Sequence, residues 1–379
     1  MLKCLITGLS ETGWPVNANL SWGKRMTTAN RIVGGGVDTH AATHHAAVLD
    51  ITGQLLAARS FPASAAGYQA LICWMVSYGC VERVGVEGTG TYGAGLTRAL
   101  HHAQVAVVEV PRPDRRLRRS HGKSDPIDAV AAARRALACH STATPKRQDG
   151  PVEAIRALRT ARLGAIKAKT ASTNTLRSMI ITAPDELRSQ LPASGLPNKI
   201  INACARLRPD LNRLHEPVHA TKAALRSIAK RAQHLRAEIS LLDDQIDELL
   251  AQTAPTTLAV FGMGPDTTAA LLVTAGDNPD RLRSEAAFAR LCGVAPIPAS
   301  SGKTNRHRLH RGGDRSANRA LHIAAVVRMR HCERTRAYVD RRTAEGLTKP
   351  EIIRCLKRYL AREIYRTIRT DYAALQRPT

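Results

Sequence analysis

Residues 31–50, "RIVGGGVDTHAATHHAAVLD", begin the folded part of the chain and decide its class. Their apolar, β-branched runs predict two strands, and after a turn at "ITGQ" the stretch "LLAARSFPA" (55–63) predicts a third. The next segments predict a helix in "SAAGYQALICWMVSYG", a strand in "RVGVEG", a helix in "AGLTRALHHA", a strand in "VAVVEV" and a helix starting near Ser124. We therefore expect an α/β domain over residues 31–148.

This order of elements resembles the ribonuclease H-like fold, whose mixed sheet carries acids on the first and fourth strands and on the last helix. Asp38 ends the first predicted strand and Glu87 ends the fourth, although acids are depleted in strands. Asp125 and Asp128 lie three residues apart at the start of the last helix, so they share a face. In such a sheet all four carboxylates would converge.

Four carboxylates in one place need a counter-charge, and a hard divalent cation with oxygen ligands supplies it. We expect Mg²⁺, because two such ions can activate the attacking oxygen and stabilise the leaving oxygen in phosphodiester cleavage. Taken alone, Asp125, Pro126 and Asp128 would be interpreted as an ordinary helix cap.

Composition indicates a polyanionic partner. The 379 residues include 56 Lys and Arg against 31 Asp and Glu, a formal charge of +25. Nucleic acid is the first candidate, while an aromatic content of 3% argues against a single-strand binder built on base stacking. Composition does not distinguish DNA from RNA. The residues expected to contact phosphates are Arg115, Arg116, Arg118, Arg119 and Lys123 beside the acids, and Lys303, Arg306, Arg308 and Arg311 near the C-terminal end.

The rest of the chain is predicted to be helical. Apolar residues at three and four spacing in "RALRTARLGAIKAK" and "LRAEISLLDDQIDELLAQ" predict a coiled-coil linker or oligomerisation region over 149–255, with an ordinary helical bundle as the alternative. Residues 256–379 predict a mainly helical domain. Residues 1–30 show no periodicity and are expected to be a disordered extension, with Met26 as a possible true start.

The bulk features also bear on location. Eight scattered Cys without a C-x-x-C pair indicate reduced thiols. No apolar run reaches membrane-spanning length, and the N-terminus lacks the pattern of a secretory leader. We therefore expect a cytoplasmic protein without a membrane partner.

The combined motifs resemble a known family. "GVDTH", "VEGTGTYG", "GKSDPIDA" and "LCGVAPIPASSGKTNRHRLHRGGDRSANRALH" are similar to the DEDD transposases of bacterial insertion sequences (the IS-one-ten family), relatives of the Piv site-specific DNA invertases. The likeness covers nearly everything after Met26. One departure is that many members have a Lys soon after the first Asp, where this chain has Ala41 and Ala42.

The resemblance implies a RuvC-like nuclease domain with Asp38, Glu87, Asp125 and Asp128 as its catalytic, metal-binding tetrad, and a C-terminal transposase domain with Ser301 as nucleophile. It further implies homodimers or tetramers acting on element ends and target DNA, with a structured guide RNA in some members.

The residues around Ser301 are compatible with that role. A serine hydroxyl near Lys303, Arg306 and Arg308 could approach a phosphate whose charge they neutralise. A flexible polar turn is the alternative, and Ser300 is the rival nucleophile. The histidines of "HRLHRGG" could bind a metal, but the flanking arginines favour phosphate contact.

We therefore expect a transposase or site-specific recombinase that cuts and rejoins DNA. The alternatives are a RuvC-like structure-specific endonuclease acting by hydrolysis, and a non-catalytic nucleic-acid-binding protein. A tyrosine recombinase using Tyr338 would leave the four acids unexplained.

Overall fold

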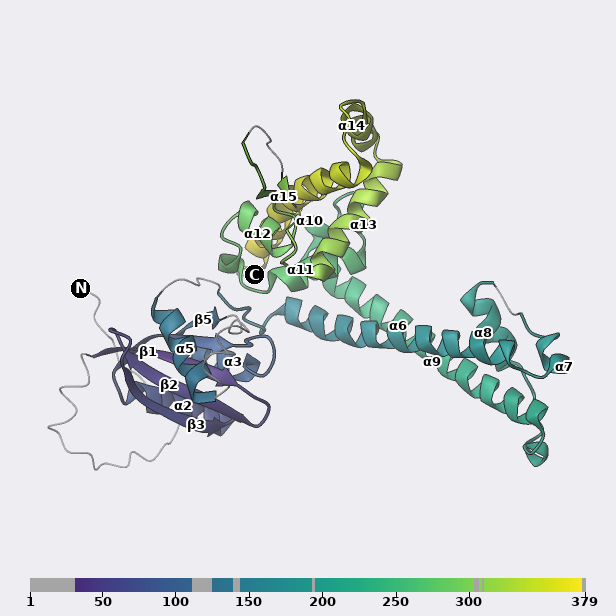
Figure 1. The fold of residues 1–379 in the computed structure, drawn as a ribbon, viewed down its shortest axis with the longest axis horizontal. Helices are drawn as coiled ribbons and strands as arrows, with labels where there is room; N and C mark the ends of the chain where they lie inside the picture. Colours follow the sequence, from purple (N-terminus) through teal and green to yellow (C-terminus); the bar gives the residue numbers. More distant parts are fainter. Residues whose placement is uncertain are drawn as a thin grey trace. The chain divides into compact units, whose positions relative to one another are not determined.

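A computed structural model describes residues 31–110, 125–138, 144–192, 195–302, 307–308 and 310–376, but not the side chains of Asp125 and Pro279. The chain divides into two compact units, Met1–Pro145 and Lys146–Thr379 (Figure 1). The division lies close to the predicted boundary at residue 148. The second unit contains both 149–255 and 256–379, and a further domain boundary near 255 stays a prediction.

The N-terminal unit contains every element that the sequence predicts for it. Its elements are β1 (Ile32–Thr39), β2 (Thr43–Asp50), β3 (Leu55–Pro62), α2 (Ala65–Val76), β4 (Cys80–Glu87), α3 (Ala94–His102), β5 (Ala106–Val110) and α5 (Asp125–Leu137). The five strands form one mixed sheet in the order β3-β2-β1-β4-β5. β1 to β3 pair antiparallel, whereas β1, β4 and β5 are parallel. The predicted α/β class of this region is confirmed.

The two faces of this sheet are built differently. On one face, Val33 and Val37 pack with Leu71 of α2 and Leu96 of α3 in a buried apolar core. Side chains along a β-strand alternate between the two faces of the sheet. On the face opposite Val33 and Val37, the β1 positions are therefore Gly34 and Gly36.

These glycines let α5 lie directly on the sheet. A Cβ added at Gly36 would be 2.1 Å from the backbone N of Ala133 and 2.2 Å from the carbonyl O of Ala129. One at Gly34 would be 2.5 Å from the Leu137 side chain. The C-terminal end of α5 therefore lies near the start of β1, and its N-terminal end lies toward the end of that strand, where Asp38 lies.

The C-terminal unit is mostly helical. Its elements are α6 (Pro151–Ile181), α7 (Asp185–Arg188), α8 (Pro197–Ala205), η1 (Leu211–Arg213), α9 (Pro217–Thr253), α10 (Pro255–Leu258), α11 (Pro265–Ala275), η2 (Pro279–Arg281), α12 (Glu285–Leu291), β6 (Ile297–Pro298), β7 (His307–Arg308), α13 (Arg315–His331), α14 (Glu333–Ala344) and α15 (Lys349–Leu375). None of its described helices is long and apolar enough to span a membrane.

The two long helices α6 and α9 pack along each other (Figure 1). Both begin with a proline in the first turn, where the missing N–H costs nothing. Near the α7 and α8 end, Leu176 and Ile180 of α6 share a buried cluster with Leu225 of α9. Of the apolar stripes predicted from the sequence, Ile239, Ile246 and Leu250 are buried within this chain whereas Leu241 is exposed. A role in oligomerisation stays a prediction.

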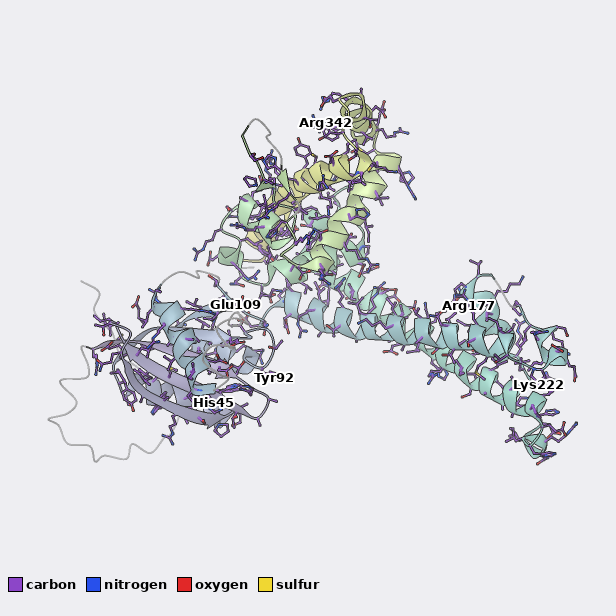
Figure 2. The ribbon with its side chains drawn as sticks, viewed as in Figure 1. His45, Tyr92, Glu109, Arg177, Lys222 and Arg342 are labelled. Atoms are coloured by element: carbon purple, nitrogen blue, oxygen red, sulfur yellow. The ribbon has the colours of Figure 1, made fainter. Side chains whose placement is uncertain are left out.

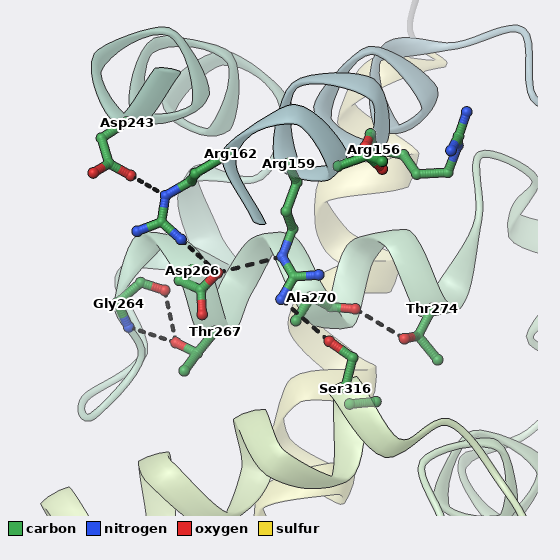
Figure 3. Close-up of polar contacts among 12 residues, drawn as sticks. Arg156, Arg159, Arg162, Asp243, Gly264, Asp266, Thr267, Ala270, Thr274 and Ser316 are labelled. Carbon is green, nitrogen blue, oxygen red and sulfur yellow. Dashed lines mark hydrogen bonds and ion pairs between the residues drawn. The ribbon is translucent and has the colours of Figure 1, made fainter. Parts of the chain in front are cut away.

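A polar network joins the α6–α9 pair to α11 and α13 (Figure 3). Arg159 Nε lies 3.3 Å from Asp266 Oδ1 of α11, and its Nη2 donates to Ser316 Oγ of α13 at 3.2 Å. Arg162 bridges Asp266, at 3.3 Å, and Asp243 of α9. With side-chain exposures of 12% and 18%, the two arginines fix how four helices meet.

Candidate active site

Asp38 and Glu87 lie at the ends of neighbouring parallel strands. Val37 of β1 pairs with Val86 of β4, so the two acids follow at the same level and face away from the valine core. They are 6% and 8% exposed. Thr39 Oγ1 donates to the carbonyl O of Glu87 at 2.8 Å, which ties the two strand ends together. The sheet topology therefore brings these two predicted residues to one edge.

Asp128 reaches the same face from α5. It is 9% exposed and adjoins Ala129, whose carbonyl O lies over Gly36, two residues before Asp38. Helix geometry puts Asp125 one turn earlier on the same face of α5, but its side chain lies outside the described part. Three predicted acids thus share one face and one end of the sheet.

A complete metal cluster stays a prediction. Among the described side chains, no group of three or more His, Cys, Asp or Glu is arranged to hold a metal ion. The donor chemistry itself fits a hard divalent cation, because buried carboxylates are costly unless a positive charge compensates them.

Two histidines border the acids, and sequence reasoning missed both. His45 of β2 (labelled in Figure 2) pairs with Asp38 across the sheet, and its Nδ1 lies 2.9 Å from Ser60 Oγ of β3. His40 Nδ1 lies 3.8 Å from Asp38 Oδ2, and its ring meets the His45 ring edge-on at 6.1 Å between centroids. The signal was present as three histidines within seven residues of Asp38 in "DTHAATHH".

The neighbouring His44 belongs to the core instead. It is fully buried and stacks on Tyr68 of α2, with ring centroids 5.5 Å apart. Burial lowers the pKa of His44, which favours the neutral imidazole. Of the two adjacent histidines, only His45 faces the acids.

The candidate nucleophile lies in the C-terminal unit. Ser300 and Ser301 are exposed between β6 and β7, which pair through Ile297 with Arg308 and Pro298 with His307. The sequence predicts no strands here, because two-residue strands show no periodicity. Gly302 has φ +55°, a conformation that favours glycine in the turn.

Close backbone contacts fix the base of this hairpin. A Cβ at Gly313 would be 2.6 Å from the backbone N of Gly293, and Asp314 N donates to Leu291 O at 2.7 Å. The Asp314 side chain then caps α13 by accepting from Ser316 N and Ala317 N.

The predicted phosphate contacts fall partly outside the described residues. Arg308 and Arg311 are described, and both are exposed. Arg115, Arg116, Arg118, Arg119, Lys123, Lys303 and Arg306 lie outside.

Comparison with known proteins yields matches in both units. Residues 35–182 match the family model of the IS110-type DEDD transposases, which includes all four acids, and residues 257–340 match the "Transposase IS116/IS110/IS902 family", which includes Ser301. Among relatives, an insertion element IS110 uncharacterized 43.6 kDa protein of Streptomyces coelicolor is 34% identical over 136 residues, 35% of this chain and 33% of the relative.

An insertion element IS900 uncharacterized 42 kDa protein of Mycobacterium paratuberculosis is 29% identical over 134 residues, 35% of this chain and 34% of the relative. The chain thus spans about a third of the length of these curated relatives. The two family models are more extensive, since together they cover more than half of the chain in the expected order. On these matches, the chain belongs to the IS110 family of DEDD transposases.

Proposed function

We propose that this chain is a DNA transposase and site-specific recombinase that cuts and rejoins strands at the ends of its element. The observation that carries the proposal is the common face of Asp38, Glu87 and Asp128, three carboxylates each less than a tenth exposed. The sheet order and the helix across these strand ends favour the RuvC-like assignment.

Asp38, Glu87, Asp125 and Asp128 would hold the divalent cation, for which we propose Mg²⁺. When bound, the cation would polarise the phosphate and lower the pKa of an attacking hydroxyl. The chain's own contribution is to hold the acids at fixed positions, because two lie on a rigid sheet and two on a helix seated against glycines.

Ser301 is the proposed nucleophile. Its Oγ would attack the phosphorus, forming a serine–phosphodiester bond while the bond from phosphorus to the leaving strand oxygen breaks. The serine proton passes to a base and the leaving oxygen takes up a proton. A hydroxyl of the new strand then attacks the same phosphorus and releases Ser301, so no oxidant or energy source is needed.

The base that takes the proton of Ser301 is proposed to come from the carboxylate site of the N-terminal unit. This requires that the Ser301 hairpin meets that site when both are bound to DNA. We therefore propose a composite active site, in which the carboxylates of the N-terminal unit serve Ser301 of the same or another copy. The family resemblance supports a homodimer or tetramer, and a structured guide RNA is part of the proposal on the same ground.

The decisive experiment traps a denaturation-resistant protein–DNA adduct with element-end DNA and Mg²⁺. Ser301→Ala should abolish the adduct and strand exchange, while Ser300→Ala should retain both. Asp38→Ala or chelation of Mg²⁺ should abolish cleavage but leave DNA binding largely intact, since the Arg and Lys side chains that contact phosphates remain. An adduct that survives Ser301→Ala would refute the nucleophile.

The same assay separates the endonuclease alternative. DNA that is cut without any adduct, by a reaction that still requires Asp38, would mean hydrolysis by a RuvC-like nuclease. Binding without cleavage under every condition would mean a non-catalytic nucleic-acid-binding protein.

A further inference from the structure

A cavity of about 720 Å³ lies at the base of the Ser301 hairpin in the C-terminal unit. One wall consists of residues 293–296 and the β7 strand of the hairpin. The other wall is the first half of α15, with Arg342 of α14 (labelled in Figure 2) at the margin. Its volume is in the range of sites that hold small ligands.

The lining of this cavity is strongly basic. Among the lining residues, Glu351 is the one acid, and it accepts from Thr348 N at 2.9 Å and Thr348 Oγ1 at 2.6 Å as the cap of α15. Its charge is therefore engaged at the helix start. The lining cations are Arg308, Arg342, Arg354, Lys357 and Arg358, accompanied by His307 and His310. Five cations against one acid make the cavity suited to an anion.

Two of these arginines are also engaged outside the cavity. Arg358 Nη1 lies 2.7 Å from Glu285, and Arg342 pairs with Glu345. Arg354 lies 3.7 Å from Glu351, the lining acid, and Arg308 is exposed. The remaining lining cation is Lys357. Its side chain is 8% exposed, and within the described chain it pairs with no carboxylate.

The position of the Lys357 ammonium is fixed by a neutral group. Nζ donates to Asn318 Oδ1 at 2.8 Å, and Asn318 Nδ2 donates to the carbonyl oxygens of Cys292 and Gly293, both at 3.0 Å. The amide therefore cannot rotate without losing two bonds. An ammonium has three donors, and a buried cation is costly without an anion to pair with. Burial accordingly lowers the pKa of Lys357.

Lys357 is also coupled to the hairpin through the backbone. Gly293, whose carbonyl holds Asn318, contacts Gly313 at the point where the hairpin closes. An anion seated on Lys357 would thus lie beside the stem that presents Ser301.

We propose that this cavity binds one backbone phosphate of a DNA strand, with Lys357 as the buried cation, and so fixes the strand relative to the Ser301 hairpin. The proposal rests on the proposed function for the identity of the strand. A phosphate diester fits because it is a compact monoanion that accepts several N–H donors at once, and the arginines around Lys357 supply them.

The test uses the full chain in three forms: wild type, Lys357→Met and Lys349→Met. Lys349 is exposed on the same helix and does not line the cavity, so it is a control matched in charge and chemistry. The first probe is inorganic phosphate in a thermal unfolding assay. Phosphate should raise the midpoint of wild type and Lys349→Met but not of Lys357→Met, whereas a general salt effect would be equal in all three.

The second probe is element-end DNA carrying a single neutral methylphosphonate linkage, scanned along each strand. One linkage should weaken binding to wild type roughly tenfold to a hundredfold, the loss expected for a charge-assisted contact. The same linkage should have a much smaller effect on Lys357→Met, because the buried partner charge is gone and only the arginine contacts remain to be lost. Arg308→Gln changes an exposed residue and leaves the core intact, so it replaces Lys357→Met in this test if that variant does not fold. In Arg308→Gln the same methylphosphonate should weaken DNA binding by a smaller factor than in wild type.

Equal phosphate stabilisation in Lys357→Met and wild type would overturn the site. Stabilisation by phosphate or adenosine monophosphate that DNA does not displace would mean a free nucleotide ligand and would overturn the strand assignment. If phosphate binding depends on Lys357 but no strand exchange is found, the site stands and the proposed function fails.

Discussion

Replacing Gly36 with alanine should separate the acids on the sheet from those on α5. The new Cβ would be 2.1 Å from the backbone N of Ala133 and 2.2 Å from the carbonyl O of Ala129, and neither atom can move without the helix. Reaching an ordinary contact of 3.4 Å requires α5 to retreat by about 1.3 Å. Overpacking of this kind costs about 1–3 kcal/mol. Misplacing catalytic groups by ~1 Å can cost roughly a hundredfold in rate.

The measurement combines the urea midpoint with the rate of Mg²⁺-dependent DNA cleavage, at a temperature where the variant is fully folded. Gly34→Ala is the matched control within the sheet, because its Cβ would meet the rotatable end of Leu137. Gly164→Ala in α6 meets nothing within 4 Å and should stabilise its helix slightly. Wild-type cleavage by Gly36→Ala, or an equal loss from Gly34→Ala, would refute the idea that close seating of α5 positions Asp128.

Three further predictions concern the C-terminal unit. Asp371→Ala should lower the free energy of unfolding by about 2–4 kcal/mol in urea titrations, because the buried carboxylate accepts from Thr257 N at 3.0 Å and Thr257 Oγ1 at 2.6 Å. Arg159→Met should cost about 1 kcal/mol or less in the same assay, since its partner Asp266 is 40% exposed; a larger loss would mean that the junction is dry. Burial lowers the pKa of Lys357 in the folded state, so the unfolded chain binds the proton more readily. The free energy of unfolding of wild type should therefore rise relative to that of Lys357→Met as pH increases toward 10.5, the ordinary pKa of a lysine. A constant difference between the two proteins across that pH range would contradict the buried charge.

Much of the N-terminal unit could be predicted from sequence because its periodicities are strong and its topology is restrictive. Once β1 and β4 are parallel neighbours, Asp38 and Glu87 at their ends must lie side by side. The glycines of β1 gave a weaker indication of where the last helix packs. In sequence, "GGG" indicates flexibility, whereas in the structure Gly36 is the surface on which α5 rests.

Other features depend on register or on distant packing, which no local pattern encodes. His45 rather than His44 faces the acids because of the short turn between β1 and β2, and a slip of one residue would exchange them. Lys357 looks like any lysine on an amphipathic helix. In the structure it is buried, and its ammonium donates to Asn318, which lies 39 residues earlier in the sequence.

The division of the chain into two units also bears on how the proposed chemistry would be controlled. The acids belong to one unit and Ser301 to the other, so neither unit would hold the whole of the proposed reaction site. If the proposed function is right, a phosphate fixed on Lys357 would align the strand with the hairpin before the carboxylates engage it. Cutting would then require DNA bound to both units at once, and the exposed serine would have no general base until that assembly forms. The buried carboxylates would likewise have no attached nucleophile, which would make strand transfer, rather than stray hydrolysis, the expected outcome.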